Sequence, residues 1–121
     1  MTIPEDQREG TIFDKIVAGE IPCDTVWEDD QALAFRDINP VAPTHILVIP
    51  KRRIVNQAHA TEEDRELMGH LMWAVGEVAR QEGLEEGGYR VVLNNGAGAG
   101  QSVFHMHLHI LAGRHLNWPP G

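Results

Sequence analysis

This sequence of 121 residues has little cysteine and no long apolar run. Its single cysteine, Cys23, rules out a disulfide within the chain and fits a reducing compartment. Residues 1–10 are polar and charged and contain no apolar segment of the kind found in signal peptides. No apolar run approaches the ~20 residues that a membrane helix needs. We therefore expect a cytoplasmic protein without a membrane partner.

Basic residues are also few. Ten Lys and Arg residues are outnumbered by 18 Asp and Glu residues, and the formal net charge is -8. Phosphate backbones and anionic lipids repel such a chain, so we expect no nucleic-acid partner. A small anionic ligand remains compatible with this charge, because local hydrogen-bond donors can outweigh the overall field. The length and the hydrophobic fraction of 42% are typical of one globular domain.

Histidine is concentrated near the C-terminus, where His105, His107 and His109 recur at every second position. A β-strand has a side-chain period of two, so an extended backbone places the three imidazoles in one row. A helix would spread them over about 400° at roughly 100° per residue. We therefore predict a strand through the three histidines. The residues that it would turn toward a core are Phe104, Met106, Leu108 and Ile110.

Three interpretations of this row compete. It is the polar face of a half-buried strand, or a metal site, or a site of phosphate chemistry. Imidazole suits Zn²⁺, and alternating histidines can supply two or three ligands. However, Cys23 is far away in sequence, and the chain has no HExxH motif. Neutral imidazole is a nucleophile near pH 7, and protonated imidazole donates to phosphate oxygens.

The other segments predict an α+β domain. Residues 1–10 form a mobile lead-in, and a single domain covers residues 11–121, of which 114–121 are a C-terminal tail. A short helix follows the N-cap Thr11, and a long helix of about 22 residues runs from the N-cap Thr61 to Gly83. Tight turns between strands favour an antiparallel sheet. Strands besides the histidine strand are expected over residues 25–28, 32–36, 44–49 and 89–94.

A glycine-rich loop over residues 95–100 leads to Ser102 and the histidines. Such loops let backbone N–H groups approach an anion closely. This loop matches neither the Walker A pattern nor GxGxxG, and no helix follows it. Its position makes it a candidate phosphate cradle all the same. The run Lys51-Arg52-Arg53 is interpreted as a solvated basic turn.

These motifs resemble those of the histidine triad superfamily. Residues 105–111 match its His-φ-His-φ-His-φ-φ signature, where φ is hydrophobic. The resemblance covers nearly the whole chain. Within the superfamily, the chain is most similar to the histidine triad nucleotide-binding protein branch. Other stretches that carry it are Thr11-Ile12-Phe13, Ala42-Pro43-Thr44-His45, Gly100-Gln101-Ser102-Val103 and Trp118-Pro119-Pro120-Gly121.

The resemblance implies a five-stranded antiparallel sheet with one short and one long helix. It also implies a homodimer with a ten-stranded sheet, in which the tail carries Trp118 toward the partner's active site. The implied activity is that of a purine nucleoside phosphoramidase. This enzyme hydrolyses the P–N bond of adenosine 5′-phosphoramidates, and of aminoacyl-adenylate-like species, to a nucleoside monophosphate. No metal or other cofactor is expected.

The resemblance also assigns roles to residues. His107 would attack the α-phosphorus and form a nucleotidyl-histidine, which water then hydrolyses. His109 and Ser102 would bind phosphate oxygens, and Ser102 would help to protonate the leaving amine. The other members of the catalytic set are His105 and His45. Asp37 would accept from the ribose hydroxyls. The remaining nucleotide-binding residues would be Ile12, Phe13, Ile16, Phe35, Ile38, Leu47, Asn94, Gly100 and Gln101.

Two alternatives stay open. One is a dinucleoside polyphosphate hydrolase or nucleotidyltransferase on the same fold. Those branches often carry glutamine where this chain has Leu111, and Ser102 before the triad favours the phosphoramidase. The other is a non-catalytic nucleotide- or zinc-binding regulatory scaffold. Asn117 stands where some relatives carry histidine, which leaves the leaving-group preference open. The physiological substrate and the choice between adenine and guanine also stay open.

Overall fold

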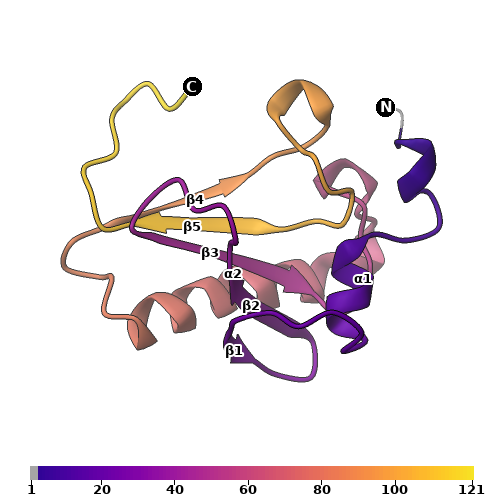
Figure 1. Cartoon of the computed structure of the whole chain (residues 1–121), viewed down its shortest axis with the longest axis horizontal. Coiled ribbons are helices and arrows are strands. Elements are labelled where there is room, and N and C mark those ends of the chain that lie inside the picture. Colours follow the sequence, from indigo (N-terminus) through magenta and orange to yellow (C-terminus); the bar gives the residue numbers. More distant parts are fainter. Residues whose placement is uncertain (1–2) are drawn as a thin grey trace.

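The computed structural model, which describes residues 3–121, contains a five-stranded antiparallel sheet (Figure 1). The strand order is β1-β2-β3-β5-β4, and every neighbouring pair is antiparallel. The predicted α+β class, with one short and one long helix, is confirmed. The elements are β1 (Thr25–Glu28), β2 (Ala32–Arg36), β3 (Thr44–Pro50), β4 (Tyr89–Leu93), β5 (Leu108–Ala112), α1 (Ile12–Val17) and α2 (Arg65–Gln81).

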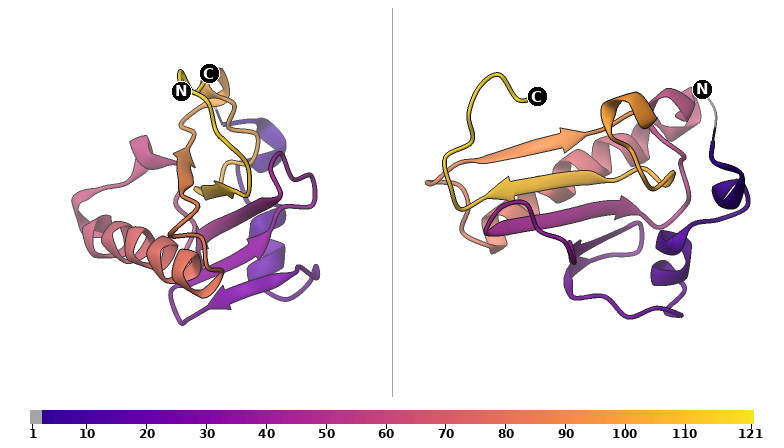
Figure 2. Two further views of the ribbon diagram at one scale, coloured as in Figure 1. Left: turned by 90° about the vertical axis from the view of Figure 1, so that its left-hand side faces the viewer. Right: turned by 45° about the horizontal axis from the view of Figure 1, so that its top comes forward.

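The two helices cover opposite faces of the sheet (Figure 2). The cause is the period-two alternation of strands that are apolar on both faces. In the central strand β3, Ile46 and Val48 pack in the core beneath α2, whereas Leu47 and Ile49 pack with Phe13 of α1. Strand β2 divides in the same way. The sheet therefore has two cores, and the smaller one lies beside α1.

Helix α2 begins later than predicted. Thr61, the predicted N-cap, forms a capping box with Asp64, but the turn that they close is a 3-10 turn over Glu62–Asp64. The α-helix proper therefore has 17 residues and not about 22. Gly83 follows it with a φ of 69°, a conformation that glycine adopts without strain. Within residues 3–121, no helix has the length and apolar character required to cross a bilayer.

The predicted histidine strand is shorter than expected. Strand β5 starts at Leu108, so only His109 of the three histidines lies in the sheet. Leu108 pairs with the last residue of β4 and with Val48 of β3, and the sheet pairing ends there. Before this strand the backbone bends at residues 103–105, and His105 and His107 are buried along with their apolar neighbours. The four residues predicted to face a core, Phe104, Met106, Leu108 and Ile110, are all buried.

The N-terminal segment, predicted as a lead-in outside the domain, contacts the domain through its described residues. A 3-10 turn over Glu5–Gln7 brings Gln7 against residues 102–104, to which its side chain hydrogen bonds. Arg53, expected in a solvated turn, is half-buried and donates to three carbonyls, those of Gln7, Arg8 and Phe104. Gln7 and Arg53 are held for the same reason. The backbone of residues 102–104 has no sheet partner, and the side chains of Gln7 and Arg53 hydrogen bond to it instead. Met1 and Thr2 lie outside the described residues.

Candidate active site

A cavity of about 540 Å³ opens beside α1, on the face of the sheet that carries the smaller core. Its wall includes His107, His109, Ser102 and Asp37. The apolar residues predicted to surround a purine all line it, namely Ile12, Phe13, Ile16, Phe35, Ile38 and Leu47. Strands β2, β3 and β5, together with α1, therefore bring residues from four separate stretches of the sequence to one cavity.

His107 has a defined tautomer. Its Nδ1 lies 2.8 Å from the carbonyl oxygen of His105, and a carbonyl oxygen can only accept. Nδ1 therefore carries the proton, and Nε2 has a free lone pair. Burial lowers the pKa of His107, which keeps the ring neutral, and the Phe13 ring packs edge-on at 5.1 Å between centroids. The site thus holds a neutral imidazole with one nucleophilic nitrogen.

His45 and His109 form a second ordered pair. The N–H of Val41 donates to Nδ1 of His45, so the proton of His45 is on Nε2. This Nε2 lies 2.9 Å from Nδ1 of His109 and 3.4 Å from Oδ2 of Asp37. Nδ1 of His109 therefore accepts, and its Nε2 carries a proton. Burial, with His107 and His45 nearby, lowers the pKa of His109 to about 4. His109 is a neutral hydrogen-bond donor.

His105 is buried and does not line the cavity. Its Nε2 donates to the carbonyl of Pro50 at 2.7 Å. Its Nδ1 has no hydrogen-bond partner among residues 3–121 and lies 3.8 Å from Oδ1 of Asp14. Desolvation lowers the pKa of His105 and keeps it neutral. His105 therefore acts on the site through its backbone carbonyl, which orients His107.

The Asp37–His45–His109 cluster is the group within residues 3–121 that could hold a metal ion, since its ligand atoms lie within 4.8 Å of one another. A metal would need the lone pair of Nε2 on His45. That nitrogen carries a proton, because Nδ1 already accepts from Val41. The cluster therefore suits hydrogen bonding between neutral groups and is a poor fit to a cation.

Gln101 does not line the cavity, although it was predicted to bind nucleotide. Its buried Oε1 accepts from Asn56 Nδ2 and Gly96 N, and its Nε2 donates to the carbonyls of Val55 and Val103. A carboxamide has two acceptor and two donor positions, so all four are used. Gln101 holds the glycine-rich loop in place and has no side-chain hydrogen bond left for a ligand.

Two further predicted residues, Asn94 and Gly100, stay outside the cavity wall. Gly100 has a φ of 98°, which glycine adopts readily, and it turns the chain toward Ser102. The N–H groups of Ser102 and Val103 donate to no other group among residues 3–121. Ser102 and Val103 both line the cavity, so these two N–H groups and the Ser102 hydroxyl are hydrogen-bond donors without a protein partner in its wall.

Sequence reasoning missed part of the wall. The loop that follows α1 contributes Ile21, Pro22, Cys23 and Asp24, and the β2–β3 loop contributes Asn39. The apolar pair Ile21-Pro22 is a weak signal, because any loop that packs on a sheet can carry it. Only the three-dimensional course of the chain brings these residues to the cavity.

The profile of the HIT domain family matches residues 18–116. The chain therefore belongs to the histidine triad (HIT) family. It is 58% identical over 113 residues to an uncharacterized HIT-like protein of Synechococcus elongatus, a match that covers 93% of this chain and 98% of that protein. It is 56% identical over 113 residues to a protein named 14 kDa zinc-binding protein from Zea mays, covering 92% of this chain and 88% of that protein.

Solved structures agree in fold. A HIT family hydrolase from Legionella pneumophila superposes with a TM-score of 0.88 at 49% identity, covering 91% of this chain and 98% of that one. A histidine triad nucleotide-binding protein from Candida albicans has a TM-score of 0.78 at 30% identity, covering 91% and 83%. The chain thus shares its fold with a hydrolase and a nucleotide-binding protein of the same family.

Proposed function

We propose that this chain is a purine nucleoside phosphoramidase, which hydrolyses the P–N bond of adenosine 5′-phosphoramidates and aminoacyl-adenylate-like species. The observation that carries the proposal is the tautomer of His107: Nδ1–H bonds to the carbonyl of His105, and Nε2 keeps its lone pair beside the cavity. A neutral imidazole held in this way is an activated nucleophile that needs no separate base.

In the first step, Nε2 of His107 attacks the α-phosphorus and a P–N bond to the histidine forms. The P–N bond to the leaving amine breaks, its electron pair goes to the amine nitrogen, and the Ser102 hydroxyl delivers a proton to that nitrogen. In the second step, water attacks the phosphorus, His107 leaves, and the proton of water restores the hydroxyl. The proton on Nδ1 stays bonded to the carbonyl of His105 throughout.

Phosphate charge is stabilised by fixed donors. His109 offers Nε2–H, because its Nδ1 accepts from His45. The N–H groups of Ser102 and Val103 supply two more donors without a partner elsewhere in residues 3–121. Donors that are already oriented stabilise developing charge without reorganisation, which is usually a large contribution to catalysis. The proposed mechanism uses no metal.

The base and ribose contacts follow from the rest of the wall. Phe13 and Phe35 meet edge-to-face at 5.6 Å between centroids, and Ile38 is 90% exposed at the rim. A purine bound there would cover this apolar surface. Asp37 is fixed through Oδ1 by the N–H of Asn39, and its carboxylate is an acceptor for ribose hydroxyls. The name of the Candida albicans neighbour, a nucleotide-binding protein, supports the same class of ligand.

We also propose a cytoplasmic homodimer with a ten-stranded sheet. Strand β4 is at an edge of the sheet, and α2 exposes Met72 and Trp73, which are 57% and 52% exposed. Trp73 packs against Trp27 of β1, at the opposite edge of the sheet from β4, so the open β4 edge and the exposed Met72 are the features that suit pairing with a second copy. In that dimer the tail carries Trp118 toward the partner's cavity.

The test is turnover of a fluorogenic adenosine phosphoramidate in the presence of a chelator. We expect the wild type to turn over and His107→Ala to lose several orders of magnitude in kcat. His70→Ala is the control, because His70 lies outside the cavity and bonds Asp29. Wild-type inactivity combined with AMP binding would favour the non-catalytic scaffold. Preferred cleavage of a dinucleoside polyphosphate would favour the other enzyme class.

A further inference from the structure

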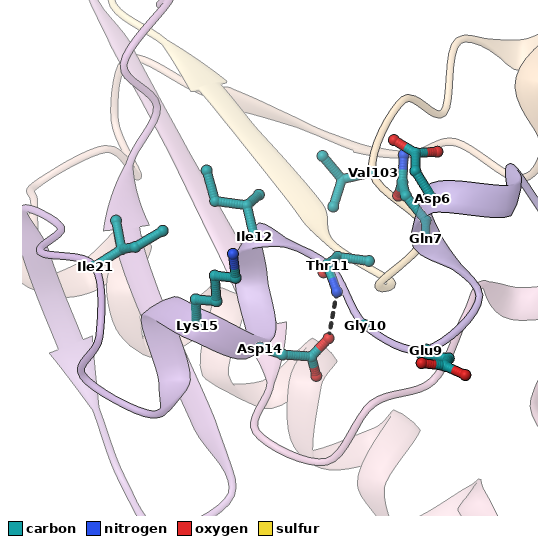
Figure 3. Close-up of a pocket in the computed structure, with 10 residues that line it drawn as sticks. All are labelled: Asp6, Gln7, Glu9, Gly10, Thr11, Ile12, Asp14, Lys15, Ile21 and Val103. Atoms are coloured by element: carbon teal, nitrogen blue, oxygen red, sulfur yellow. Dashed lines mark hydrogen bonds between the residues drawn. The ribbon is translucent and has the colours of Figure 1, made fainter.

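A second cavity, of about 630 Å³, shares Ile12, Ile21 and Val103 with the wall of the active-site cavity, and Figure 3 shows its lining residues. Gln7 and Val103 both line it. No proposed catalytic step involves Gln7, which comes from the N-terminal segment. Its carboxamide nevertheless contacts the backbone on both sides of Val103, immediately before the histidine triad.

We propose that Gln7 is a positioning residue for the active site, an inference that rests on the phosphoramidase proposal above. Its carboxamide holds the backbone of residues 102–104 so that the donors of Ser102 and Val103 face the phosphate. Gln7 acts through these donors and does not touch the substrate itself.

The carboxamide of Gln7 bonds one backbone carbonyl and one backbone N–H of residues 102–104, as a peptide group of a neighbouring strand would. Nε2 of Gln7 donates to the carbonyl of Ser102 at 2.9 Å, and Oε1 accepts from the N–H of Phe104 at 2.7 Å. Both bonds are short, and together they fix the direction of the peptide groups on either side of Val103. A single flexible contact would leave this stretch free to rotate.

Arg53 fixes the position of Gln7 in turn. Its guanidinium donates to the carbonyls of Gln7 and Arg8, at 2.5 and 3.1 Å. The same group donates to the carbonyl of Phe104 at 2.8 Å. Charged donors that bond several carbonyls are stronger and more directional than neutral ones. The guanidinium of Arg53, which follows β3 in the chain, therefore hydrogen bonds both the N-terminal segment and the stretch before the triad.

The consequence concerns which backbone groups remain for a ligand. The carbonyl of Ser102 is used by Gln7, that of Val103 by Gln101, and that of Phe104 by Arg53. The N–H of Phe104 is used as well. The N–H groups of Ser102 and Val103 are the ones left without a partner among residues 3–121. With its carbonyls bonded in this way, the segment offers donors to an anion.

Three variants test this inference. Gln7→Met keeps the length of the side chain but can neither donate nor accept as the carboxamide does. We expect its kcat on the fluorogenic phosphoramidate to fall about tenfold or more, because small displacements of catalytic groups have effects of this size. KM should change little, since the base and ribose contacts are elsewhere. Glu5→Ala, in the same 3-10 turn but exposed, is the matched control.

Gln7→Glu adds a readout that simple packing would not move. An ionised carboxylate accepts from Phe104 but faces the Ser102 carbonyl with no proton to donate. The protonated carboxyl makes both bonds. We therefore expect the kcat of Gln7→Glu, divided by that of the wild type at the same pH, to rise as the pH falls toward the carboxyl pKa of about 4.3. A ratio that does not vary with pH would overturn the inference.

Hydrogen exchange measures the contact independently of activity. The amide of Phe104 should exchange about tenfold faster in Gln7→Met than in Glu5→Ala, while that of Ala58, bonded to Asn95, should be unchanged. Wild-type kcat in Gln7→Met would overturn the inference whatever the exchange rate. If the wild type itself fails to turn over, the phosphoramidase proposal falls. Exchange of the Phe104 amide then decides: equal exchange rates in Gln7→Met and Glu5→Ala would overturn the role of Gln7.

Discussion

Nε2 of His45 lies 2.9 Å from Nδ1 of His109, and the N–H of Val41 occupies the other nitrogen of His45. A backbone donor on the β2–β3 loop thereby decides which nitrogen of a histidine on β5 carries a proton. The bond from Val41 fixes the tautomer of His45, and His45 in turn fixes that of His109, which lines the cavity. His45 controls the site in this way without lining it.

Replacement of His45 by phenylalanine should therefore impair chemistry more than binding. His45→Phe keeps a ring at this buried position but removes the donor to His109, whose tautomer is then free. We expect kcat to fall about tenfold to a hundredfold with a smaller change in KM, because one oriented donor to the phosphate is lost in part. Steady-state kinetics on the fluorogenic substrate measure both constants. A rise in KM at constant kcat would contradict this role.

Stability should decrease in mild acid. Burial lowers the pKa of His109 to about 4 in the folded chain, against about 6.5 when unfolded. The unfolded chain therefore takes up protons that the folded chain does not, and stability is lost as the pH falls from about 6.5 to about 4. Through His109 alone, the free energy of unfolding should fall by on the order of 3 kcal/mol over this pH range. Urea denaturation across this range measures it.

The matched variant for the pH experiment is His109→Gln, which removes the titrating ring but keeps a polar side chain. Its free energy of unfolding should vary less with pH than that of the wild type. His45, His105 and His107 also have lowered pKa values because they are buried, so part of the dependence should remain. An identical pH dependence in wild type and variant would refute the assignment to His109.

Arg90 should affect the leaving group and leave the nucleotide contacts intact. Its guanidinium donates to the carbonyls of Leu116 and Asn117 and lies 5.9 Å from the ring centroid of Trp118, which is 80% exposed. Arg90→Ala frees the tail from these contacts. We expect kcat/KM to change several-fold between substrates with small and bulky amines, while the affinity for AMP stays constant. Calorimetry and competition kinetics measure the two quantities, and an equal effect on every amine would contradict a role of the tail in selectivity.

Patterns that lie within one element could be predicted from the sequence. The alternation of apolar residues from Phe104 to Ile110 correctly predicts four buried side chains, although β5 begins only at Leu108 and the backbone bends at residues 103–105. The almost wholly apolar strand that starts at Thr44 is central, as its composition indicates. The N-cap Thr61 depends on neighbouring residues alone, and it caps the chain before α2 as predicted, together with Asp64.

Contacts between distant segments could not be predicted. Gln7 and Arg53 look like solvated surface residues in the sequence, because nothing near them shows that the backbone at residues 102–104 lacks a sheet partner. Gln101 stands beside Ser102 in a stretch that resembles a ligand loop, yet its carboxamide turns inward to Asn56. The proton positions on His45 and His107 depend on carbonyl and amide partners that only the fold supplies.

The fully bonded carboxamide of Gln101 has a consequence for binding thermodynamics. Ordering a flexible backbone costs about 1–2 kcal/mol per residue, and here that cost for the glycine-rich loop is met when the chain folds. A ligand that meets a loop already in place loses little conformational entropy to it. Association should therefore be fast, with a rate set by diffusion into the cavity and not by a slow closing of the loop.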